Sequence, residues 1–227
     1  MARAVASPAE SPPVASPHHT GSAHLPPAPA PIPQGCDFVL GICSVGSLVA
    51  SIGVGTLVVP DDFYCPADLR RVYTDARAHL MPGFDEGLRQ GILASARAAG
   101  FHPLGHGTYV NTKGPRFETK AEIRIMAQAG HIVGMTGAHE CVACAEVGLP
   151  YAALCMVDNF AHGIGEKLTV DAFHAAQTIN MASLERAVAA MLTDVPAAWR
   201  DAAAAEEAAG SAAAPPAAAP AAGAPPH

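Results

Sequence analysis

Apolar residues in the middle of the chain fall into short continuous runs that alternate with longer amphipathic stretches. The short runs predict buried β-strands, because a strand covered on both faces carries apolar residues at successive positions. They lie at residues 38–43, 56–59, 107–110, 132–133 and 151–157. The longer stretches predict helices at residues 87–99, 119–129, 140–147 and 170–192. Strands alternating with helices indicate an α/β domain with a mixed, largely parallel central sheet flanked by helices.

Two of the predicted helices carry specific signals at their ends. Gly100 follows the first helix in the position of a glycine C-cap. Thr119 and Glu122 have the spacing of a capping box at the start of the second, which ends at Gly130. These signals predict where the two helices stop and start.

Four polar loops follow the predicted strands, and strand ends are where α/β domains collect ligand-binding groups. They are residues 44–47, 113–119, 134–137 and 158–163. Each loop taken alone also has an ordinary explanation, since glycine supplies turns and Thr or Asn caps helices. Their functional meaning therefore depends on whether they belong together.

Proline is concentrated at the two ends of the chain. Of the 21 prolines among 227 residues, nine lie within residues 1–35 and six within residues 196–227. Both ends are Pro/Ala-rich and lack the apolar periodicity that offsets the entropy of ordering. We expect a disordered segment at 1–35, one folded domain at 36–195 and a disordered tail at 196–227.

The overall charge and hydrophobicity exclude several classes of partner. The chain has 20 acidic and 13 basic residues, a formal net charge of −7 and no Lys/Arg cluster, which opposes binding to nucleic acid. No apolar run approaches the roughly 18 to 20 residues of a membrane span, and no secretory signal core follows the first methionine. We expect a cytoplasmic protein without a membrane or nucleic-acid partner.

Cysteine chemistry is one open interpretation. Among six cysteines only Cys141 and Cys144 have motif spacing, which is compatible with a zinc site or a redox dithiol. No second Cys/His pair stands at zinc-finger spacing, and the residues around the pair predict a helix. The simpler interpretation is two small side chains on one helix face, and we expect no metal.

Taken together, the loops carry the motifs of one enzyme family. The motifs are GTYVNTKGPRFETKAE at 107–122, VGMT at 133–136 followed by Glu140, and YA at 151–152 leading to Asn159. Upstream, SVGSL at 44–48 and VPDDF at 59–63 have matching order and spacing. Over residues 38 to about 192, the chain resembles the purine nucleoside phosphorylase and methylthioadenosine phosphorylase family.

The resemblance implies a nucleoside phosphorylase-like fold and a phosphorolysis reaction. Inorganic phosphate attacks the anomeric carbon of a purine nucleoside and releases free base and pentose 1-phosphate. Such an enzyme must stabilise a purine that is becoming anionic and hold an anionic nucleophile beside the sugar. The resemblance implies phosphate as co-substrate, with no metal and no organic cofactor.

For the base, the resemblance places Glu118 and Asn159 at the catalytic, purine-recognition positions. A carboxylate can accept the N1 hydrogen of a 6-oxopurine, and an amide offers a donor and an acceptor to the N7 and O6 edge. The implied substrates are inosine, guanosine or S-methyl-5'-thioinosine. Members that prefer 6-aminopurines tend to carry serine in place of Glu118 and aspartates in place of Asn159 and Ala161. Phe117 is expected beside the base and Met135 beside the sugar, with core packing as the alternative for both.

For phosphate, the resemblance implies the Thr136 hydroxyl and the backbone amide of Ser44. Arg116 is either a further anion ligand or a structural residue beside the Gly-Pro turn. The family usually assembles as a trimer, and His79 is expected to face the neighbouring subunit's sugar site. Val170 falls near the 5' substituent, where its apolar side chain suits a methylthio group.

The amino end departs from the family pattern. Family members begin with a strand and a glycine-rich turn that binds phosphate, followed by an Arg-His pair, whereas the residues before Phe38 contain neither motif. We therefore expect an N-terminally truncated domain. Three functions stay open beside thiol or metal chemistry: a 6-oxopurine nucleoside phosphorylase, a noncatalytic purine-nucleoside-binding remnant, and a methylthioadenosine phosphorylase.

Overall fold

The computed structural model describes residues 36–66, 69, 71–165 and 169–212, with side chains up to residue 193. The expected disordered segment 1–35 and the last part of the expected tail, residues 213–227, lie outside the described residues.

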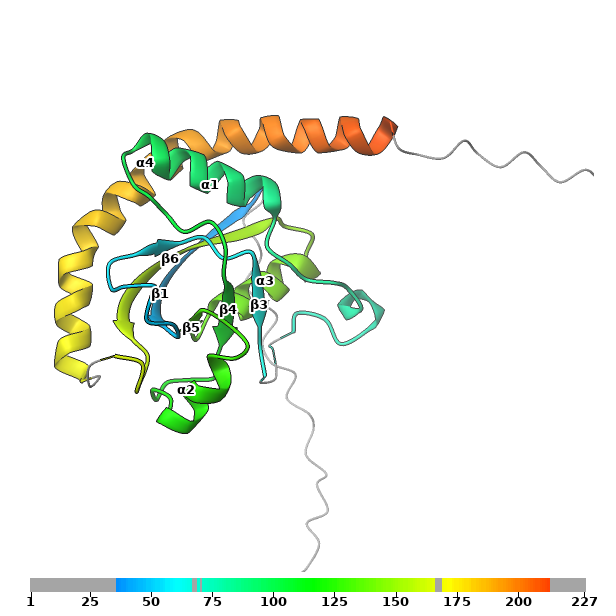
Figure 1. Ribbon diagram of the computed structural model, residues 1–227. Coiled ribbons are helices and arrows are strands. Elements are labelled where there is room, and N and C mark those ends of the chain that lie inside the picture. Colours follow the sequence, from blue (N-terminus) through cyan, green and yellow to red (C-terminus); the bar gives the residue numbers. More distant parts are fainter. Residues whose placement is uncertain (1–35, 67–68, 70, 166–168, 213–227) are drawn as a thin grey trace, which may run out of the picture. The chain divides into compact units, whose positions relative to one another are not determined.

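One mixed β-sheet forms the centre of the domain (Figure 1). Its strands are β1 (Val39–Ser47), β2 (Leu57–Val58), β3 (Asp62–Tyr64), β4 (Thr108–Asn111), β5 (Ile132–Gly134) and β6 (Tyr151–Phe160). They lie in the order β2-β6-β1-β5-β4-β3. The pairs β6–β1, β5–β4 and β4–β3 are parallel, and the pairs β2–β6 and β1–β5 are antiparallel. The predicted mixed, largely parallel sheet is confirmed.

Helices pack on both faces of this sheet. They are α1 (Glu86–Ala98), α2 (Lys120–Met126), α3 (Gly137–Glu146) and α4 (Val170–Ala212), together with the short 3-10 helix η1 (Ala76–Ala78). The capping box at Thr119 and Glu122 is present at the start of α2, as predicted. Helix α1 likewise begins at Asp85, whose side chain accepts a hydrogen bond from the Leu88 amide at 2.7 Å.

The central strand β6 shows how the core is divided. Its residues are buried on both faces, so successive side chains enter different layers of the core. Ala152, Leu154 and Met156 pack with residues of α1 and α4, whereas Tyr151, Ala153, Cys155 and Val157 pack with Cys141 of α3. A third cluster joins Ile123 of α2 to Val110 of β4 and Val133 of β5.

Two segments that the sequence predicts as loops belong to strands. β1 continues through residues 44–47 and β6 through residues 158–160. The physical reason is that the two strands pair in parallel from Val39 and Tyr151 to Ser47 and Phe160. The polar residues at the ends of these strands are consequently held by ladder hydrogen bonds, and a rigid backbone presents them.

Three further differences concern element ends. Strand β3 has exposed first and third residues and no apolar alternation, so the pattern did not reveal it. Helix α3 begins at Gly137, before the predicted start at residue 140. Helix α4 continues to Ala212, beyond the predicted end at residue 192 and into the segment 196–212 that we expect to be disordered. Alanine has the highest helix propensity, and this segment is rich in it.

A search for membrane-spanning helices covers the same described residues. In them, no helix combines the length and the hydrophobicity needed to cross a bilayer.

Candidate active site

A cleft with a volume of about 510 Å³ lies where β1, β5 and β6 meet the loop after β4 and the first turns of α4. Its lining residues are Ile42, Cys43, Ser44, Val45, Gly46, Pro115, Phe117, Glu118, Val133, Gly134, Met135, Thr136, Asn159, Ala161, Val170, Phe173, His174 and Gln177. Seven of the nine site residues expected from the sequence are in this set. The fold therefore brings together side chains that are far apart in the sequence.

The loop after β4 carries Glu118 into the cleft. The loop turns at Gly114, whose φ of 58° favours glycine, and a Cβ there would lie 2.5 Å from the Met135 sulfur. Glu118 is buried, with 8% of its surface exposed, and its Oε1 accepts a hydrogen bond from the Thr112 hydroxyl at 2.7 Å. The carboxylate thus has a fixed neighbour on one side and the cleft on the other.

Asn159 enters the cleft beside an irregularity in β6. Val45 pairs with Val157, but Gly46 pairs with Asn159, so Asp158 is an extra residue in the ladder. Such a bulge re-aims the side chains that follow it. The Asn159 side chain is 8% exposed and its Nδ2 donates to the Phe160 carbonyl at 2.9 Å. Its amide oxygen and its second N–H are the groups available to a ligand.

The bulged residue Asp158 links three elements beneath the cleft. Its carboxylate is 4% exposed; Oδ2 accepts from the Ser44 hydroxyl at 2.5 Å, and Oδ1 accepts from Asn180 Nδ2 at 2.8 Å. Gln177 Nε2 donates to the same Ser44 hydroxyl at 3.4 Å. Ser44 on β1 is therefore tied to β6 and to α4 at once.

Thr136 is the N-cap residue of α3 and lines the cleft. The Tyr109 hydroxyl accepts from the backbone amides of Thr136 and Gly137 at 3.3 and 3.2 Å, and Asn111 Oδ1 accepts from the Ala138 amide at 3.2 Å. These two strand residues cap the helix, and the Thr136 side chain makes no capping bond. Its hydroxyl contacts the Cys43 sulfur at 3.8 Å, and the helix N-terminus favours negative charge there.

Several buried thiol and phenol groups lie near Cys43, which lines the cleft. Cys43 of β1 and Cys155 of β6 are partners in the ladder, and a hydrogen bond from Cys155 lowers the pKa of the Cys43 thiol. Burial raises the pKa of the Cys155 thiol and of the Tyr109 hydroxyl. Burial also raises the pKa of Tyr151, whose hydroxyl donates to Glu140 at 2.7 Å. Tyr109 therefore stays protonated at neutral pH.

The outer wall of the cleft is mostly apolar and aromatic. Phe117 and Phe173 stack edge to face with ring centroids 5.5 Å apart. Val170 is 59% exposed at the start of α4, and His174 lies 5.5 Å from the Phe173 ring. This wall can contact an apolar face of a ligand, while the polar groups described above lie at the strand ends.

Arg116 does not line the cleft. Its guanidinium forms a two-pronged ion pair with Glu122, with nitrogen–oxygen distances of 2.9 and 2.7 Å. The Glu122 carboxylate also accepts from the Thr119 amide at 2.7 Å. The Arg116 hydrogen bond lowers the pKa of Glu122 to about 2. Arg116 thus stabilises the start of α2. This contact favours a structural role for Arg116 over a role as an anion ligand.

His79 also lies outside the cleft, exposed at the end of η1. The segment that carries it is attached to α3 at two points. The Glu146 carboxylate accepts from the backbone amides of Val72 and Tyr73, and the Cys141 thiol donates to the Gly83 carbonyl at 3.2 Å. His79 therefore projects from an anchored segment.

The motif-spaced cysteines have different surroundings. Cys141 is buried, and burial raises the pKa of its thiol to about 12; burial also raises the pKa of the half-buried Cys144. Over the described ranges, no group of three or more His, Cys, Asp or Glu side chains has an arrangement that could hold a metal ion. The arrangement favours the simpler interpretation of a packed helix face.

Several residues of the site were missed by sequence reasoning. They are Cys43, Gly46, Tyr109, Asn111, Thr112, Asp158 and Gln177. Tyr109, Asn111 and Thr112 lie within the family motif at 107–122, which was a usable signal. Nothing in the sequence singles out the contact of Asp158 with Ser44, because it depends on the bulge.

The sequence is similar to those of several known phosphorylases. The chain is 40% identical over 131 residues to a probable 6-oxopurine nucleoside phosphorylase of Archaeoglobus fulgidus, covering 57% of this chain and 54% of the relative. It is 38% identical over 152 residues to a probable S-methyl-5'-thioinosine phosphorylase of Methanocaldococcus jannaschii, covering 60% and 56%. It is 35% identical over 134 residues to an S-methyl-5'-thioadenosine phosphorylase of Hyperthermus butylicus, covering 56% and 48%. The chain thus spans about half the length of these curated relatives.

Solved structures agree on the fold. A methylthioadenosine phosphorylase from Schistosoma mansoni in complex with adenine superposes with a TM-score of 0.63 at 25% identity, covering 77% of this chain and 71% of that chain. The sequence profile of the Phosphorylase superfamily matches residues 22–193, well over half of the chain. The chain therefore belongs to the Phosphorylase superfamily.

Proposed function

We propose that this protein catalyses the phosphorolysis of 6-oxopurine nucleosides, with inosine, guanosine or S-methyl-5'-thioinosine as substrate. The observation that supports this most is that Glu118 and Asn159 line the same cleft as Thr136 and Ser44. A carboxylate and an amide suited to the base thus share one cleft with hydroxyl and amide groups suited to phosphate. Relatives described as 6-oxopurine and S-methyl-5'-thioinosine phosphorylases favour the same reaction.

In the proposed reaction, a phosphate oxygen bonds to the anomeric carbon as the bond between that carbon and purine N9 breaks. The electron pair of the broken bond passes to the purine. Asn159 donates a hydrogen bond to N7, and this contact strengthens as the ring becomes anionic. Glu118 accepts the N1 hydrogen and thereby selects and orients the 6-oxopurine. Thr136 and the Ser44 amide hold the phosphate below the sugar. We expect the reaction to need no organic cofactor and no metal.

The preference for 6-oxopurines follows from hydrogen-bond complementarity. An adenine ring carries an unprotonated N1 and a donor amino group at C6, so it cannot offer an N1 hydrogen to Glu118. A buried acceptor left without its donor is costly, which makes adenosine and methylthioadenosine the poorer substrates. At the sugar end, exposed Val170 and the Phe173 ring suit an apolar 5' methylthio group.

Assembly and cellular role are part of the same proposal. We expect a cytoplasmic purine-salvage enzyme that forms a homo-oligomer, a trimer by family resemblance. We expect His79, which is exposed on its anchored segment and outside its own cleft, to contact a neighbouring subunit. Gel filtration with light scattering tests the assembly directly.

The deciding experiment is an inosine assay with and without phosphate, run beside guanosine, methylthioinosine, adenosine and methylthioadenosine. Phosphate-dependent release of hypoxanthine supports the proposal. The Asn159→Ala variant is the specificity control, because losing one charge-stabilising hydrogen bond typically costs about 2.7–4 kcal/mol in the transition state. Near-normal turnover of inosine in that variant would remove Asn159 from its role.

Two other outcomes select the alternatives. Hypoxanthine binding measured by calorimetry, without release of base from any nucleoside, identifies a noncatalytic purine-nucleoside binder. Faster turnover of methylthioadenosine than of methylthioinosine identifies a methylthioadenosine phosphorylase, the activity named for the Hyperthermus butylicus relative.

A further inference from the structure

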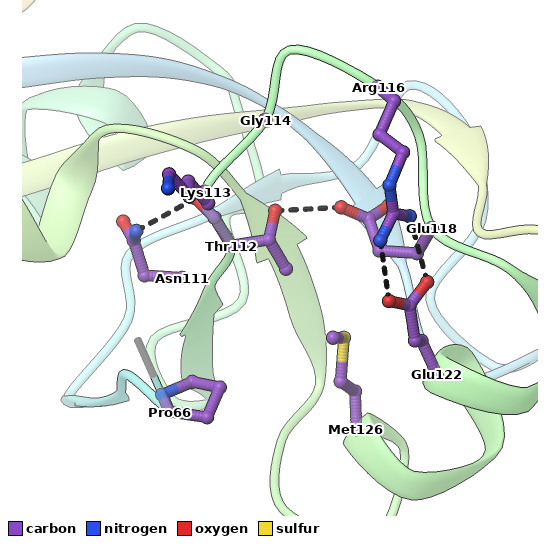
Figure 2. A pocket seen from close by; sticks show the side chains of 9 residues that line it. All are labelled: Pro66, Asn111, Thr112, Lys113, Gly114, Arg116, Glu118, Glu122 and Met126. Atoms are coloured by element: carbon purple, nitrogen blue, oxygen red, sulfur yellow. Dashed lines mark hydrogen bonds and ion pairs between the residues drawn. The ribbon is translucent and has the colours of Figure 1, made fainter. Parts of the chain in front are cut away.

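Glu118 borders three pockets. They are the nucleoside cleft, a smaller pocket of about 260 Å³ on the side of α2 (Figure 2), and a pocket of about 370 Å³ that it shares with Lys120 and His162. The smaller pocket is lined by Pro66, Asn111, Thr112, Lys113, Gly114, Arg116, Glu118, Glu122 and Met126. A carboxylate that borders several pockets takes its orientation from the contacts of its own oxygens.

The Thr112 hydroxyl makes the contact that decides this. It donates to Glu118 Oε1 at 2.7 Å, and both side chains are buried, with 7% and 8% of their surfaces exposed. Figure 2 shows the two side chains pointing toward one another from either end of the loop. A hydroxyl has one proton to donate, and the other acceptor near it, the Gly134 carbonyl, is farther away at 3.3 Å. The proton therefore goes to Glu118.

Thr112 is itself a rigid support. Its backbone amide donates to the Gly134 carbonyl at 2.8 Å, directly after β4 pairs with β5. Its β-branched side chain has few rotamers. The hydroxyl is thus fixed by the sheet, and the carboxylate takes its orientation from it.

Cations in the smaller pocket offer Glu118 a competing position. Arg116 and Lys113 both line this pocket, and Figure 2 shows the Arg116–Glu122 pair beside Glu118. Glu122 chiefly, and Glu118 to a lesser extent, raise the pKa of the Arg116 guanidinium, so Arg116 is within electrostatic reach of Glu118. Without the hydroxyl, attraction to these cations would draw the carboxylate out of the cleft.

We propose that Thr112 is a positioning residue that holds the Glu118 carboxylate toward the nucleobase, and so sets the selectivity for 6-oxopurines. One carboxylate oxygen is occupied by the Thr112 hydroxyl, and the other remains an acceptor for the N1 hydrogen of the base. This inference rests on the proposed function and adds a residue that does not touch the substrate.

The test compares Thr112→Val, which keeps the side-chain shape and removes the hydroxyl, with Thr112→Ser, which keeps the hydroxyl. Thr193→Val is the matched control, because its hydroxyl donates only to the Ala189 carbonyl at 2.8 Å on an exposed part of α4. For each protein, kcat and KM are measured with inosine, adenosine and phosphate, and the affinities for hypoxanthine and adenine are measured by calorimetry.

For Thr112→Val we expect kcat/KM with inosine to fall about tenfold, as expected for loss of a hydrogen bond to a charged group. The fall should appear mainly in the inosine KM and the hypoxanthine affinity, with the phosphate KM unchanged. The hypoxanthine-to-adenine affinity ratio should fall by a similar factor. Thr112→Ser and Thr193→Val should retain wild-type selectivity. If the valine variant does not fold, Thr112→Ala makes the same comparison.

The outcomes separate this inference from the proposed function. An active wild-type enzyme whose Thr112→Val variant keeps its inosine kinetics and base selectivity overturns the positioning role alone. Equal losses with hypoxanthine and adenine, or a matching rise in the phosphate KM, also overturn it, because they indicate general damage to the cleft. A wild-type protein that neither cleaves inosine nor binds hypoxanthine overturns both.

Discussion

Gly46 and Asn159 face each other across β1 and β6 so closely that a Cβ at position 46 would lie 3.0 Å from Asn159 Nδ2. The same Cβ would also lie 3.2 Å from Val133 Cγ1 and 3.7 Å from the Ala161 Cα. The absence of a side chain at Gly46 is thus part of how the strand pair presents Asn159 to the cleft.

We predict that Gly46→Ala lowers both activity and stability. The methyl group fits the backbone, but it must push Asn159 or Val133 aside, which costs about 1–3 kcal/mol of folding free energy. Displacing a positioned group by about 1 Å can cost up to about 100-fold in rate, so kcat/KM with inosine should fall at least tenfold. Thermal unfolding and inosine kinetics measure the two effects.

Gly53→Ala is the matched control for that substitution. Nothing lies within 4 Å of a Cβ added at Gly53. This variant should keep wild-type kinetics. Equal kinetics in the Gly46 and Gly53 variants would show that the close approach to Asn159 has no role in the site.

The second prediction is that Asp158 acts through the geometry of its hydrogen bonds and not through its negative charge. Asp158→Ala removes both of its hydrogen bonds, to Ser44 and to Asn180, and should lower the unfolding free energy by about 1–3 kcal/mol. The phosphate KM should rise, because the Ser44 hydroxyl loses its short hydrogen bond to β6 and keeps the longer contact from Gln177 at 3.4 Å. Denaturant unfolding and phosphate kinetics measure these effects.

Asp158→Asn should restore most of both properties. The new amide oxygen can still accept from Asn180, and the new amide N–H can donate to the Ser44 hydroxyl, which is able to accept. If Asp158→Asn is as impaired as Asp158→Ala, the negative charge matters and the geometric account is wrong.

Arg116 allows a third prediction, which separates phosphate binding from bracing of α2. Because its guanidinium is paired with Glu122 outside the cleft, Arg116→Gln should change the phosphate KM by less than about twofold. A rise of tenfold or more would make Arg116 a phosphate ligand. Lys113→Gln is a suitable control, since Lys113 lines the same smaller pocket.

The same variant has a predictable pH dependence. Arg116 lowers the pKa of Glu122 from its ordinary value to about 2, so the pair stabilises the fold at pH values above the unfolded-state pKa of about 4.3. This contribution is lost as the pH falls toward 2. The melting temperatures of wild type and Arg116→Gln should therefore differ by a small, constant amount above about pH 5 and converge in acid.

Structural features that depend on residues close together in the chain could be predicted from the sequence. The apolar runs predicted most strands and helices, and the Thr119–Glu122 capping box is present because its two residues are one helical turn apart. The ends of β1 and β6 were predicted as loops, because polar residues there hide a pairing between strands that are far apart in the chain.

Within the candidate site, too, local motifs identified some residues and missed those whose role depends on tertiary contacts. Motifs identified Glu118, Asn159 and Thr136, which lie in one cleft. They did not identify Tyr109 as the cap of α3 or Asp158 as the link between β1 and α4. Those roles depend on the three-dimensional packing of strands and helices, which no local pattern encodes.

Cys141 gives the last prediction, which tests thiol and metal chemistry. A thiol reacts as its thiolate, and burial raises the pKa of Cys141 to about 12, so it should resist maleimide in the native protein at pH 7–8. Peptide mass mapping should find it modified only after denaturation, while the half-buried Cys36 serves as an internal comparison. Cys141→Ser keeps a donor for the Gly83 carbonyl, so it should retain inosine turnover, and a chelator should leave turnover unchanged. Rapid native labelling of Cys141 together with loss of turnover, or inactivation by the chelator, would instead establish a thiol- or metal-dependent protein.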